Sequence, residues 1–385
     1  MTDVWAPRHV FDADHEAFRA TVRTFLQRHV VEHLEQWELD RMVPREPWLE
    51  AGRQGLLGMA VPEDLGGAGV NDFRYRYAAI EEFAKVGATS IGNGFATSVD
   101  IVLPYLLDLC TTEQAKRWVP GMTDGSLIGA VAMTEPGTGS DLMGMTTTAR
   151  RDGTDWVLSG SKTFISNGIQ SDLVVVAART GERALSLFVV ERGMKGFERG
   201  RQLRKIGLHG QDTSELSFDD VRLPADHLLG EESKGMQHLV ERLPQERMSI
   251  ATSGVSAARA ALAWTVDYVT QRRAFGKAVA EFQNTQFVLA QCLMDVEVAA
   301  AYVDAAVLRL NDGTLGVVDA AKAKHVGSET HKSVADRCLQ LYGGYGYMEE
   351  YPISRSFADA RVTTIYGGTS EIMKLIVARD LLGTR

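Results

Sequence analysis

The sequence AMTEPGTGSD, residues 132–141, marks the place where the pattern of the chain changes. From Asp12 to about Asp124, apolar residues recur at the spacing of helices. From about Ser126 to Pro224, short β-branched runs alternate with turn signals such as Asp152-Gly153 and Ser159-Gly160. We therefore expect a helical region that gives way to a β domain of sandwich or barrel type at this stretch.

Beyond the β region, helical spacing returns from about Gly235 to Leu382 in segments longer than average. The segments are interrupted near residues 273–281, 311–314 and 343–352. Long helices joined by short connections suggest an antiparallel bundle. The pattern predicts an α+β fold of three domains, namely an N-terminal helical domain, a middle β domain and a C-terminal helical bundle, at residues 1–125, 126–234 and 235–385.

Composition narrows the classes of function. The 385 residues carry a net charge of −9 and no basic cluster, so nucleic acid is not an expected partner. The cysteines Cys110, Cys292 and Cys338 lack CxxC spacing, which argues against a disulfide framework or a zinc site, and no metal is expected. The segment Met1–His15 lacks a basic and apolar leader pattern, and no apolar run reaches about 18 residues. We expect a cytoplasmic protein without a membrane span, or one in an organelle after loss of a transit peptide.

Residues 132–141 are rich in groups that suit a ligand. Their glycines allow close approach to the backbone, and Thr134 and Ser140 add hydroxyls beside the amides. This combination suits a flavin edge or a phosphate, although a plain Gly/Pro turn has the same composition. Downstream, Lys162–Asn167 brings an aromatic ring and a hydroxyl to the end of an expected strand.

Three further segments are dense in special residues. Residues 271–277, QRRAFGK, end a long helix, and an arginine there could bind a pyrophosphate or only offset the helix dipole. Residues 340–347, QLYGGYGY, contain GGxG but follow a helix rather than a strand, so they are not a dinucleotide fingerprint. Residues 366–372, YGGTSEI, join a glycine pair to an N-cap hydroxyl that opens a final helix.

In order and spacing, these segments resemble the acyl-CoA dehydrogenase family over essentially the whole chain. The resemblance rests on AMTEPGTGSD, on the pattern from Gln340 to Asp359, and on RRAFGK and YGGTSEI. Within the family, the chain is most similar to the long-chain branch, with which it shares the phrases LPQER, FISNG and IYGGT. The resemblance implies a helical domain, a β domain and a four-helix bundle, assembled as a homotetramer with FAD between domains.

The resemblance also implies which residues hold FAD. Those that would hold the isoalloxazine ring are Val131, Met133, Thr134, Gly139, Ser140, Phe164, Ile165 and Ser166, with Thr134 and Ser166 near its polar edge. Those that would hold the pyrophosphate and adenosine across a subunit interface are Arg272, Phe275, Gln283, Gln340, Leu341 and Gly344. Thr369 and Glu371 would approach the adenine end.

The implied substrate is an acyl-CoA thioester in a channel lined by Ser140, Pro244, Arg247 and Gly368. A base would remove the α proton while the β carbon gives a hydride to flavin N5, so negative charge develops on the thioester oxygen. The backbone amide of Gly367 and a ribityl hydroxyl would stabilise that charge as a preorganised oxyanion hole. An electron-transfer flavoprotein would then reoxidise the flavin.

Glu246 is the predicted base. Most family members carry a glutamate directly before the Gly-Thr of the final motif, but this chain has Gly367 there. The phrase LPQER, residues 243–247, is similar to the long-chain version, which places the base at Glu246. Helical spacing puts Glu246 on a stripe with Leu239 and Ile250, and a carboxylate on an apolar face should have a raised pKa.

Other interpretations of Glu246 and of the whole chain stay open at this point. Glu246 could favour a helix N-terminus after Pro244 or pair with Arg242 or Arg247. Glu371 is the competing base, although its motif position points toward the cofactor. The same fold hosts dehydrogenases of branched-chain acyl-CoA or acyl carrier protein substrates and oxidases that use oxygen. A catalytically silent binding protein is the alternative from a different class.

Overall fold

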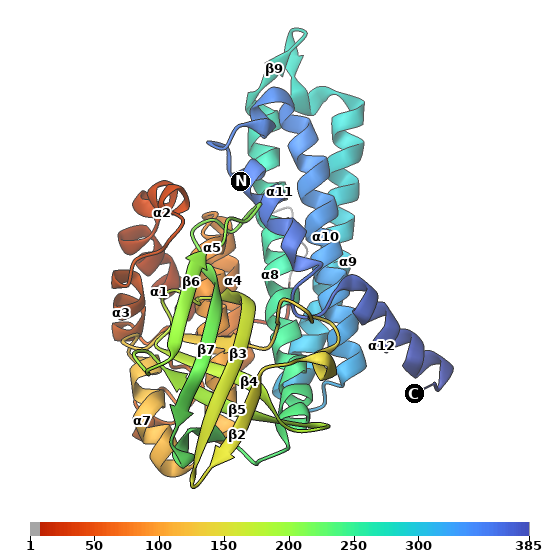
Figure 1. Ribbon diagram of the computed structural model, residues 1–385. Coiled ribbons are helices and arrows are strands. Elements are labelled where there is room, and N and C mark those ends of the chain that lie inside the picture. Colours follow the sequence, from red (N-terminus) through yellow and green to blue (C-terminus); the bar gives the residue numbers. More distant parts are fainter. Residues whose placement is uncertain (1–7, 385) are drawn as a thin grey trace.

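The structure is a computed structural model that describes residues 8–384, so the first half of the segment Met1–His15 lies outside it. The α+β fold is confirmed, with helices first, a β-sheet next and a helical bundle last (Figure 1). The predicted boundaries at 125/126 and 234/235 fall in the connections that enter and leave the sheet region. The three parts meet around one helix, α8 (Gly235–Gln271), which contacts both the first helices and the sheet.

Short helices build the first region around an aromatic core. Helix α1 begins at a capping box formed by Asp12 and His15, as its sequence favours. Phe25, Phe83 and Phe95 are buried together in the centre of this region. The helices are α1 (Ala13–His29), α2 (Leu34–Asp40), α3 (Glu46–Arg53), α4 (Phe73–Lys85), α5 (Thr89–Ala96), a π-helical segment (Thr97–Val102), α6 (Leu103–Leu109) and α7 (Thr112–Thr123).

The middle region is one eight-stranded sheet with strand order β6-β7-β3-β2-β4-β5-β8, and β1 pairs in parallel with β4. Its two halves fold over a shared core, because Trp156 and Leu216 from one half pack in the same cluster as Val176 and Phe188 from the other. The strands are β1 (Gly129–Ala132), β2 (Thr148–Asp152), β3 (Asp155–Ser166), β4 (Leu173–Gly181), β5 (Ala184–Glu191), β6 (Phe197–Gln202), β7 (Thr213–Leu223) and β8 (Leu228–Leu229).

One of the predicted turns is wrong. Asp152-Gly153 does separate β2 from β3, but Ser159-Gly160 lies inside β3. Gly160 has a φ of +145°, and the register with β7 shifts between Leu158 and Gly160. A Cβ at Gly160 would lie 2.7 Å from the Cα of Thr147. The glycine therefore marks a β-bulge that lets a neighbouring segment approach closely, not a chain reversal.

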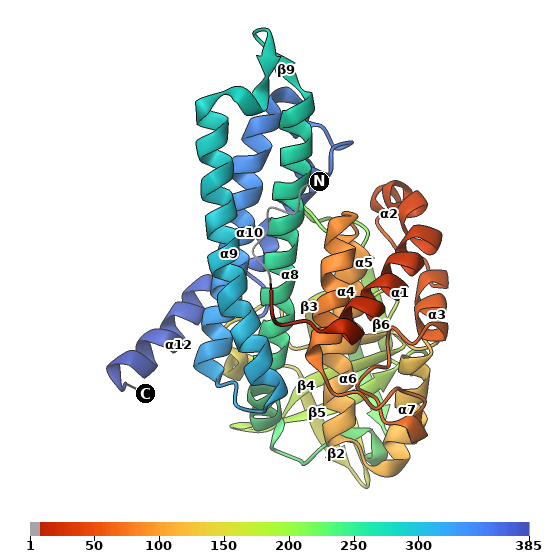
Figure 2. The ribbon, with the colours of Figure 1, turned by 180° about the vertical axis from the view of Figure 1, so that it is seen from behind.

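The last region is a bundle of long helices, interrupted where the sequence predicts. Helices α8 and α10 cross in close contact, since a Cβ on Gly254 would lie 2.5 Å from the carbonyl oxygen of Gly327. Figure 2 shows α8, α9 and α10 side by side. After α8 come the hairpin β9 (Arg273–Ala274) and β10 (Lys277–Ala278), then α9 (Gln283–Asn311), α10 (Val317–Tyr342), α11 (Pro352–Thr363) and α12 (Ser370–Leu382).

Helix α9 carries an apolar face that this chain does not cover. Phe287, Met294 and Val298 are exposed on it, Val298 to 73%. Among residues 8–384, α9 is the one helix long and apolar enough to cross a membrane by length and composition. Those two criteria do not separate a membrane span from an apolar bundle helix, and α9 packs against α8 and α10 on its other side.

Candidate active site

A cavity of about 300 Å³ lies where the three regions meet, and we call it the central cavity. Its walls come from the first helices, from the glycine-rich segment and β3, from α8, and from the turn before α12. The lining residues are Asn93, Ala96, Thr97, Ile101, Val131, Met133, Thr134, Gly139, Ser140, Leu142, Phe164, Ile165, Ser166, Leu243, Glu246, Arg247, Ser249, Ile250, Tyr366, Gly367, Gly368 and Ile372.

The cavity gathers most of the residues that the sequence singled out. All eight residues predicted for the flavin ring line it, as do Glu246, Arg247, Gly367 and Gly368. Pro244, Thr369 and Glu371 lie outside its lining, as do the six residues predicted for the pyrophosphate and adenosine, which are described below. Pro244 is half-buried within α8, Thr369 caps α12 through a hydrogen bond from Ile372 N–H, and Glu371 is exposed on α12. The sequence did not predict the wall from the first helices, which includes Ala96, Thr97 and Ile101.

Glu246 is buried inside α8 and faces the cavity. The hydroxyl of Tyr105 on α6 donates a hydrogen bond to its Oε1 at 2.8 Å. Burial raises the pKa of Glu246, while the hydrogen bond from Tyr105 and the charge of Arg247 oppose that rise. The helix N-terminus interpretation is wrong, because α8 begins at Gly235 and Pro244 stands within it.

Arg247 is 4% exposed, yet its Nε and one terminal nitrogen have no hydrogen-bond partner within residues 8–384. Burial lowers the pKa of Arg247, and the neighbouring Glu246 opposes that shift. Arg242 instead forms an ion pair with Asp108. Because an unpaired buried donor is costly, Arg247 is the group in this cavity most in need of a polar ligand.

The turn Gly367-Gly368 forms part of the cavity wall next to Ile250 of α8. Both glycines have positive φ angles, +62° and +92°, a region that favours glycine. A Cβ on Gly367 would lie 2.3 Å from Cδ1 of Ile250. Within residues 8–384, the N–H of Gly367 donates to no protein acceptor. A free amide N–H at the wall of a cavity can donate a hydrogen bond to an anionic ligand oxygen.

A buried ion pair between Lys162 and Glu135 supports the glycine-rich segment. Neither residue was assigned a role from the sequence. Lys162 on β3 is fully buried, and its Nζ lies 2.9 Å from Oε1 of Glu135 and 3.0 Å from the carbonyl oxygen of Met133. Burial alone would raise the pKa of Glu135, but hydrogen bonds from Thr147, Thr146 and Lys162 lower it to about 2. This ionised, fully paired carboxylate fixes the wall that carries Met133 and the residues after it.

Phe164 occupies an unusual place in the cavity wall. Its φ is +60°, and the pairing of β3 with β7 shifts register between Lys162 and Ile165. The bulge leaves the Phe164 side chain 69% exposed at the cavity edge. An exposed aromatic ring held by strained backbone is typical of a ligand contact rather than of core packing.

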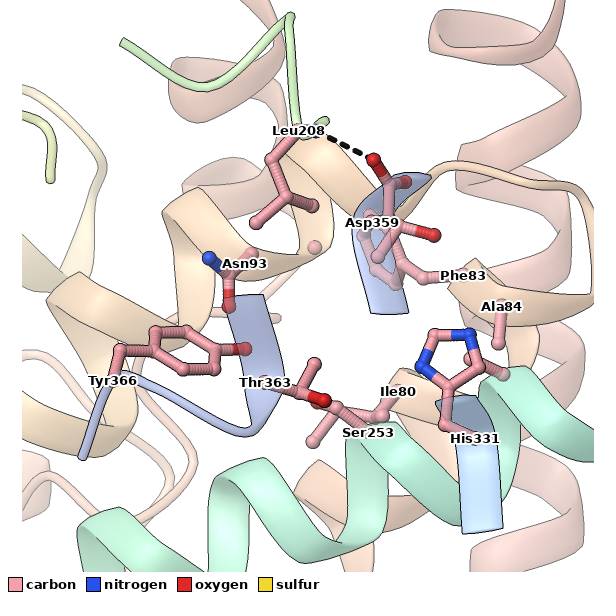
Figure 3. Close-up of a pocket in the computed structure, with 13 residues that line it drawn as sticks. Ile80, Phe83, Ala84, Asn93, Leu208, Ser253, His331, Asp359, Thr363 and Tyr366 are labelled. Carbon is pink, nitrogen blue, oxygen red and sulfur yellow. Dashed lines mark hydrogen bonds between the residues drawn. The ribbon is translucent and has the colours of Figure 1, made fainter. Parts of the chain in front are cut away.

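A second, smaller cavity of about 40 Å³ adjoins the first, and we call it the junction cavity (Figure 3). Asn93 and Tyr366 line both cavities and so form their shared wall. Asp359 accepts a hydrogen bond of 2.5 Å from the N–H of Leu208, and burial raises its pKa to about 7. Burial also lowers the pKa of His331 to about 4.

The remaining predicted cofactor residues lie at the far end of the bundle, around a surface hollow of about 520 Å³ that we call the bundle-end hollow. Arg272, Gln340, Leu341 and Gly344 line it, and the Arg272 guanidinium lies 5.1 Å from the ring centroid of Tyr345. Two predicted residues lie beside it on exposed positions: Phe275, 95% exposed at the hairpin tip, and Gln283, the first residue of α9.

Comparisons with known proteins agree over the whole chain. Three family models match, described as the N-terminal, middle and C-terminal domains of acyl-CoA dehydrogenase, at residues 12–126, 130–221 and 233–382. The mitochondrial long-chain specific acyl-CoA dehydrogenase of Sus scrofa is 48% identical, over 99% of this chain and 89% of its own.

Solved structures give the same result. An acyl-CoA dehydrogenase from Geobacillus kaustophilus is 44% identical, with a TM-score of 0.94 over 97% of this chain and 100% of that one. A glutaryl-CoA dehydrogenase from Mycobacterium smegmatis in complex with FADH2 is 29% identical, with a TM-score of 0.92 over 97% of this chain and 96% of that one.

Proposed function

This chain belongs to the acyl-CoA dehydrogenase family, and from that premise we propose that it uses FAD to convert a medium- to long-chain acyl-CoA into the trans-2-enoyl-CoA, with Glu246 as the base. Its relatives are named acyl-CoA dehydrogenases, and enzymes of this family are flavoprotein oxidoreductases. The identity of the base, the binding of FAD and the chain length are the parts that we propose.

One observation carries the assignment of the base. Among the residues that line the central cavity, all of them within the described range, Glu246 is the only carboxylic acid. Gly367 stands where most relatives are expected to carry the acid, and Glu371 is exposed on α12. A general base works best with a pKa near the working pH, and burial moves the pKa of Glu246 in that direction.

The residues of the central cavity suit a flavin. Phe164 offers an exposed ring face, and the hydroxyl residues Thr134 and Ser166 line the same cavity. A Cβ on Gly139 would meet only the methyl group of Thr134, at 4.0 Å. We propose that the eight ring residues named from the sequence hold FAD here. When bound, FAD supplies the acceptor for the hydride that leaves the β carbon.

The chain's own groups account for the rest of the chemistry. Glu246 removes the α proton, and Tyr105 holds its carboxylate in place. The free N–H of Gly367 stabilises the negative charge that develops on the thioester oxygen. Arg247 pairs with a polar part of the bound thioester, while the buried apolar walls exclude water and strengthen these interactions.

We propose that the other half of FAD is held by a second chain. Glu246 lies within α8 and Arg272 caps the C-terminus of the same helix 26 residues later, which is roughly 39 Å at 1.5 Å per residue. One FAD molecule does not bridge that span, so the bundle-end hollow of one chain would serve the central cavity of another. The uncovered apolar face of α9 supports assembly into a homotetramer.

Chain length and partners follow from similarity. The relatives at 48% identity are named long-chain specific, which favours long acyl chains over short or branched ones. A thioester of acyl carrier protein is the alternative substrate. We propose an electron-transfer flavoprotein as the electron acceptor and the cytoplasm as the location.

The first test is the colour of the purified protein. We expect it to be yellow and to bleach when a long-chain acyl-CoA is added without oxygen or another acceptor. A panel of acyl-CoA thioesters of increasing length, with branched and acyl carrier protein thioesters beside it, gives the specificity from the rate of bleaching. A colourless protein, or one that no acyl thioester bleaches, contradicts the proposed function and leaves the silent binding protein as the interpretation.

The second test separates the two candidate bases. Glu246→Gln should keep FAD and the fold but slow flavin reduction by roughly 10²- to 10⁴-fold, the typical cost of losing a general base. Glu371→Gln, a matched change on an exposed helix, should leave the rate close to that of the unmodified enzyme. Near-normal reduction in Glu246→Gln, or an equal loss in Glu371→Gln, overturns the assignment.

A further inference from the structure

Lys324 on α10 is a fully buried lysine with one hydrogen bond. Its side chain is 0% exposed, and its Nζ donates to the carbonyl oxygen of Gly368 at 2.8 Å. Within residues 8–384, the ammonium group of Lys324 forms no other hydrogen bond and no ion pair at contact distance. Gly368 belongs to the turn that closes the central cavity.

A lysine in this setting costs folding free energy. Burying an ammonium that lacks a contacting carboxylate is unfavourable, and a neutral side chain of similar length would avoid that cost. Burial and the nearby charge of Arg247 lower the pKa of Lys324 to about 8, so the group is still mostly protonated at neutral pH. A buried charge that weakens the fold beside a reaction cavity is a candidate for a functional role.

Helix α10 holds the turn at two points. Lys324 fixes the Gly368 carbonyl, and five residues later Glu329 accepts a 2.7 Å hydrogen bond from the hydroxyl of Ser370. Between these two residues, Gly327 packs directly against the backbone of α8, where a Cβ would lie 2.5 Å from the carbonyl oxygen of Ala251. The turn is therefore braced by a helix that is itself locked to the helix carrying the proposed base.

The turn is flexible without this brace, because it contains two successive glycines. Two successive glycines at positive φ can adopt many other conformations, so their own backbone does not hold the orientation of the Gly367 N–H. An oxyanion donor is effective only if it already points at the place where charge develops. Fixing the carbonyl of the adjacent residue removes that freedom.

We propose that Lys324 is a positioning residue for the oxyanion hole, whose ammonium holds the Gly368 carbonyl so that the Gly367 N–H stays directed at the thioester oxygen. The inference rests on the proposed function. Lys324 lies outside the set of residues that line the central cavity, so it acts through the turn and not by contact with the substrate. Its positive charge also favours the negative charge that develops across the turn.

Two variants of the holoenzyme test this role. Lys324→Met has nearly the same length without charge or donor, and Lys324→Gln keeps a donor without charge. Lys322→Met is the matched control, since Lys322 is two residues away on α10 and its partly exposed side chain places Nζ 3.4 Å from Oδ1 of Asp319. Flavin absorbance gives FAD content, and rapid mixing separates acyl-CoA binding from the rate of flavin reduction at saturating substrate.

A substrate analogue adds a readout that a structural role would not change. A 3-thiaacyl-CoA has sulfur in place of the β carbon, so it can lose its α proton but has no hydride to give. Its bound anion produces long-wavelength absorbance beside oxidised flavin, and a pH titration of that band measures how well the site stabilises the enolate. We expect Lys324→Met to bind FAD and acyl-CoA normally but to reduce flavin about 10- to 100-fold more slowly.

The apparent pKa of the bound analogue should rise by about one to two in Lys324→Met, the equivalent of that rate loss, and by less in Lys324→Gln. The inference is overturned if both variants reduce flavin at the normal rate with an unchanged analogue titration. It is also overturned if neither variant binds FAD, because Lys324 then acts in folding. Failure of the unmodified protein to bleach with any acyl thioester instead removes the proposed function itself.

Discussion

The central cavity and the bundle-end hollow lie at opposite ends of α8 and differ in how complete they are. The central cavity has walls from all three regions of one chain, with Glu246 and Arg247 at 4% exposure each. The bundle-end hollow has walls from the bundle alone, and Arg272 and Phe275 there are exposed to solvent. The central cavity is therefore enclosed by a single chain, whereas the bundle-end hollow is an open surface of the bundle.

This difference separates two kinds of residue. Changes to the reaction groups of the central cavity, such as Glu246 and the turn at Gly367, should impair chemistry while FAD stays bound. Changes in the bundle-end hollow should impair FAD retention and assembly while the reaction groups stay intact. Four predictions, given in order of expected size, either sharpen or break that division.

The largest effect is expected from Gly367→Ala. The new Cβ would meet Ile250 at 2.3 Å and place a side chain at a φ of +62°, so the turn must shift. A displacement of about 1 Å can cost roughly 100-fold in rate, and we expect that loss in flavin reduction with normal FAD content. Gly313→Ala is the control, because Gly313 has a φ of +67° and open space around it. A rate near that of the unmodified enzyme would remove Gly367 from the oxyanion hole.

Arg272→Ala should act on assembly rather than on chemistry. A hydrogen bond to a charged group contributes about 1.5–3 kcal/mol, so FAD affinity should fall roughly 10- to 100-fold. FAD content and oligomer size should decrease together on dilution, measured by flavin absorbance and light scattering. Arg273→Ala is the neighbouring control, since the Arg273 guanidinium bonds within the hairpin to Gly276. A fully flavinated Arg272→Ala tetramer would make the bundle-end contact dispensable.

Tyr105→Phe should change the pH dependence of the reaction. The hydroxyl of Tyr105 stabilises the ionised form of Glu246, so its loss should raise the pKa of Glu246 further. The base must be ionised to work, so the acidic limb of the kcat/KM profile should move to higher pH by about one unit, which is about 10-fold in rate below the limb. Tyr347→Phe, on an exposed ring, is the control. An unchanged profile would show that Tyr105 does not tune the base.

Ala96→Val should produce the smallest effect. Ala96 lines the central cavity on the wall from the first helices. Two added carbons should exclude about one methylene of the longest acyl chains, worth about 0.8 kcal/mol or roughly four-fold in kcat/KM. Short acyl-CoA substrates serve as the internal control and should be unaffected. An equal loss for short and long chains would place the acyl tail elsewhere.

The sequence was sufficient for features that depend on nearby residues. Helical spacing, glycine turns and the N-cap at Thr369 act over a few positions, so the three regions and the interruptions between the long helices could be predicted. The turn at Gly367 was found for the same reason, because its two successive glycines have positive φ angles.

Contacts between distant residues could not be predicted in the same way. Tyr105 meets Glu246 across 141 residues of sequence, and in the sequence it is one more large residue in an apolar helix. Lys324 meets Gly368 across 44 residues. The sequence did contain a signal that Lys324 is buried. Lys324 stands at helical spacing with Ala320, Gly327 and His331, which are all buried in α10. A lysine on such a stripe has to be explained by what it binds.

Protein stability and proton uptake are coupled at the junction cavity. Asp359 has a pKa of about 7 in the folded chain and about 3.8 when exposed, so the folded chain keeps a proton that the unfolded chain has lost between those values. Unfolding in that window releases this proton to solvent, and the free energy of unfolding therefore falls as the pH rises from about 4 to about 7. Asp359 joins α11 to the loop at Leu208, which connects two strands of the sheet. The packing of the sheet against the bundle therefore depends on pH.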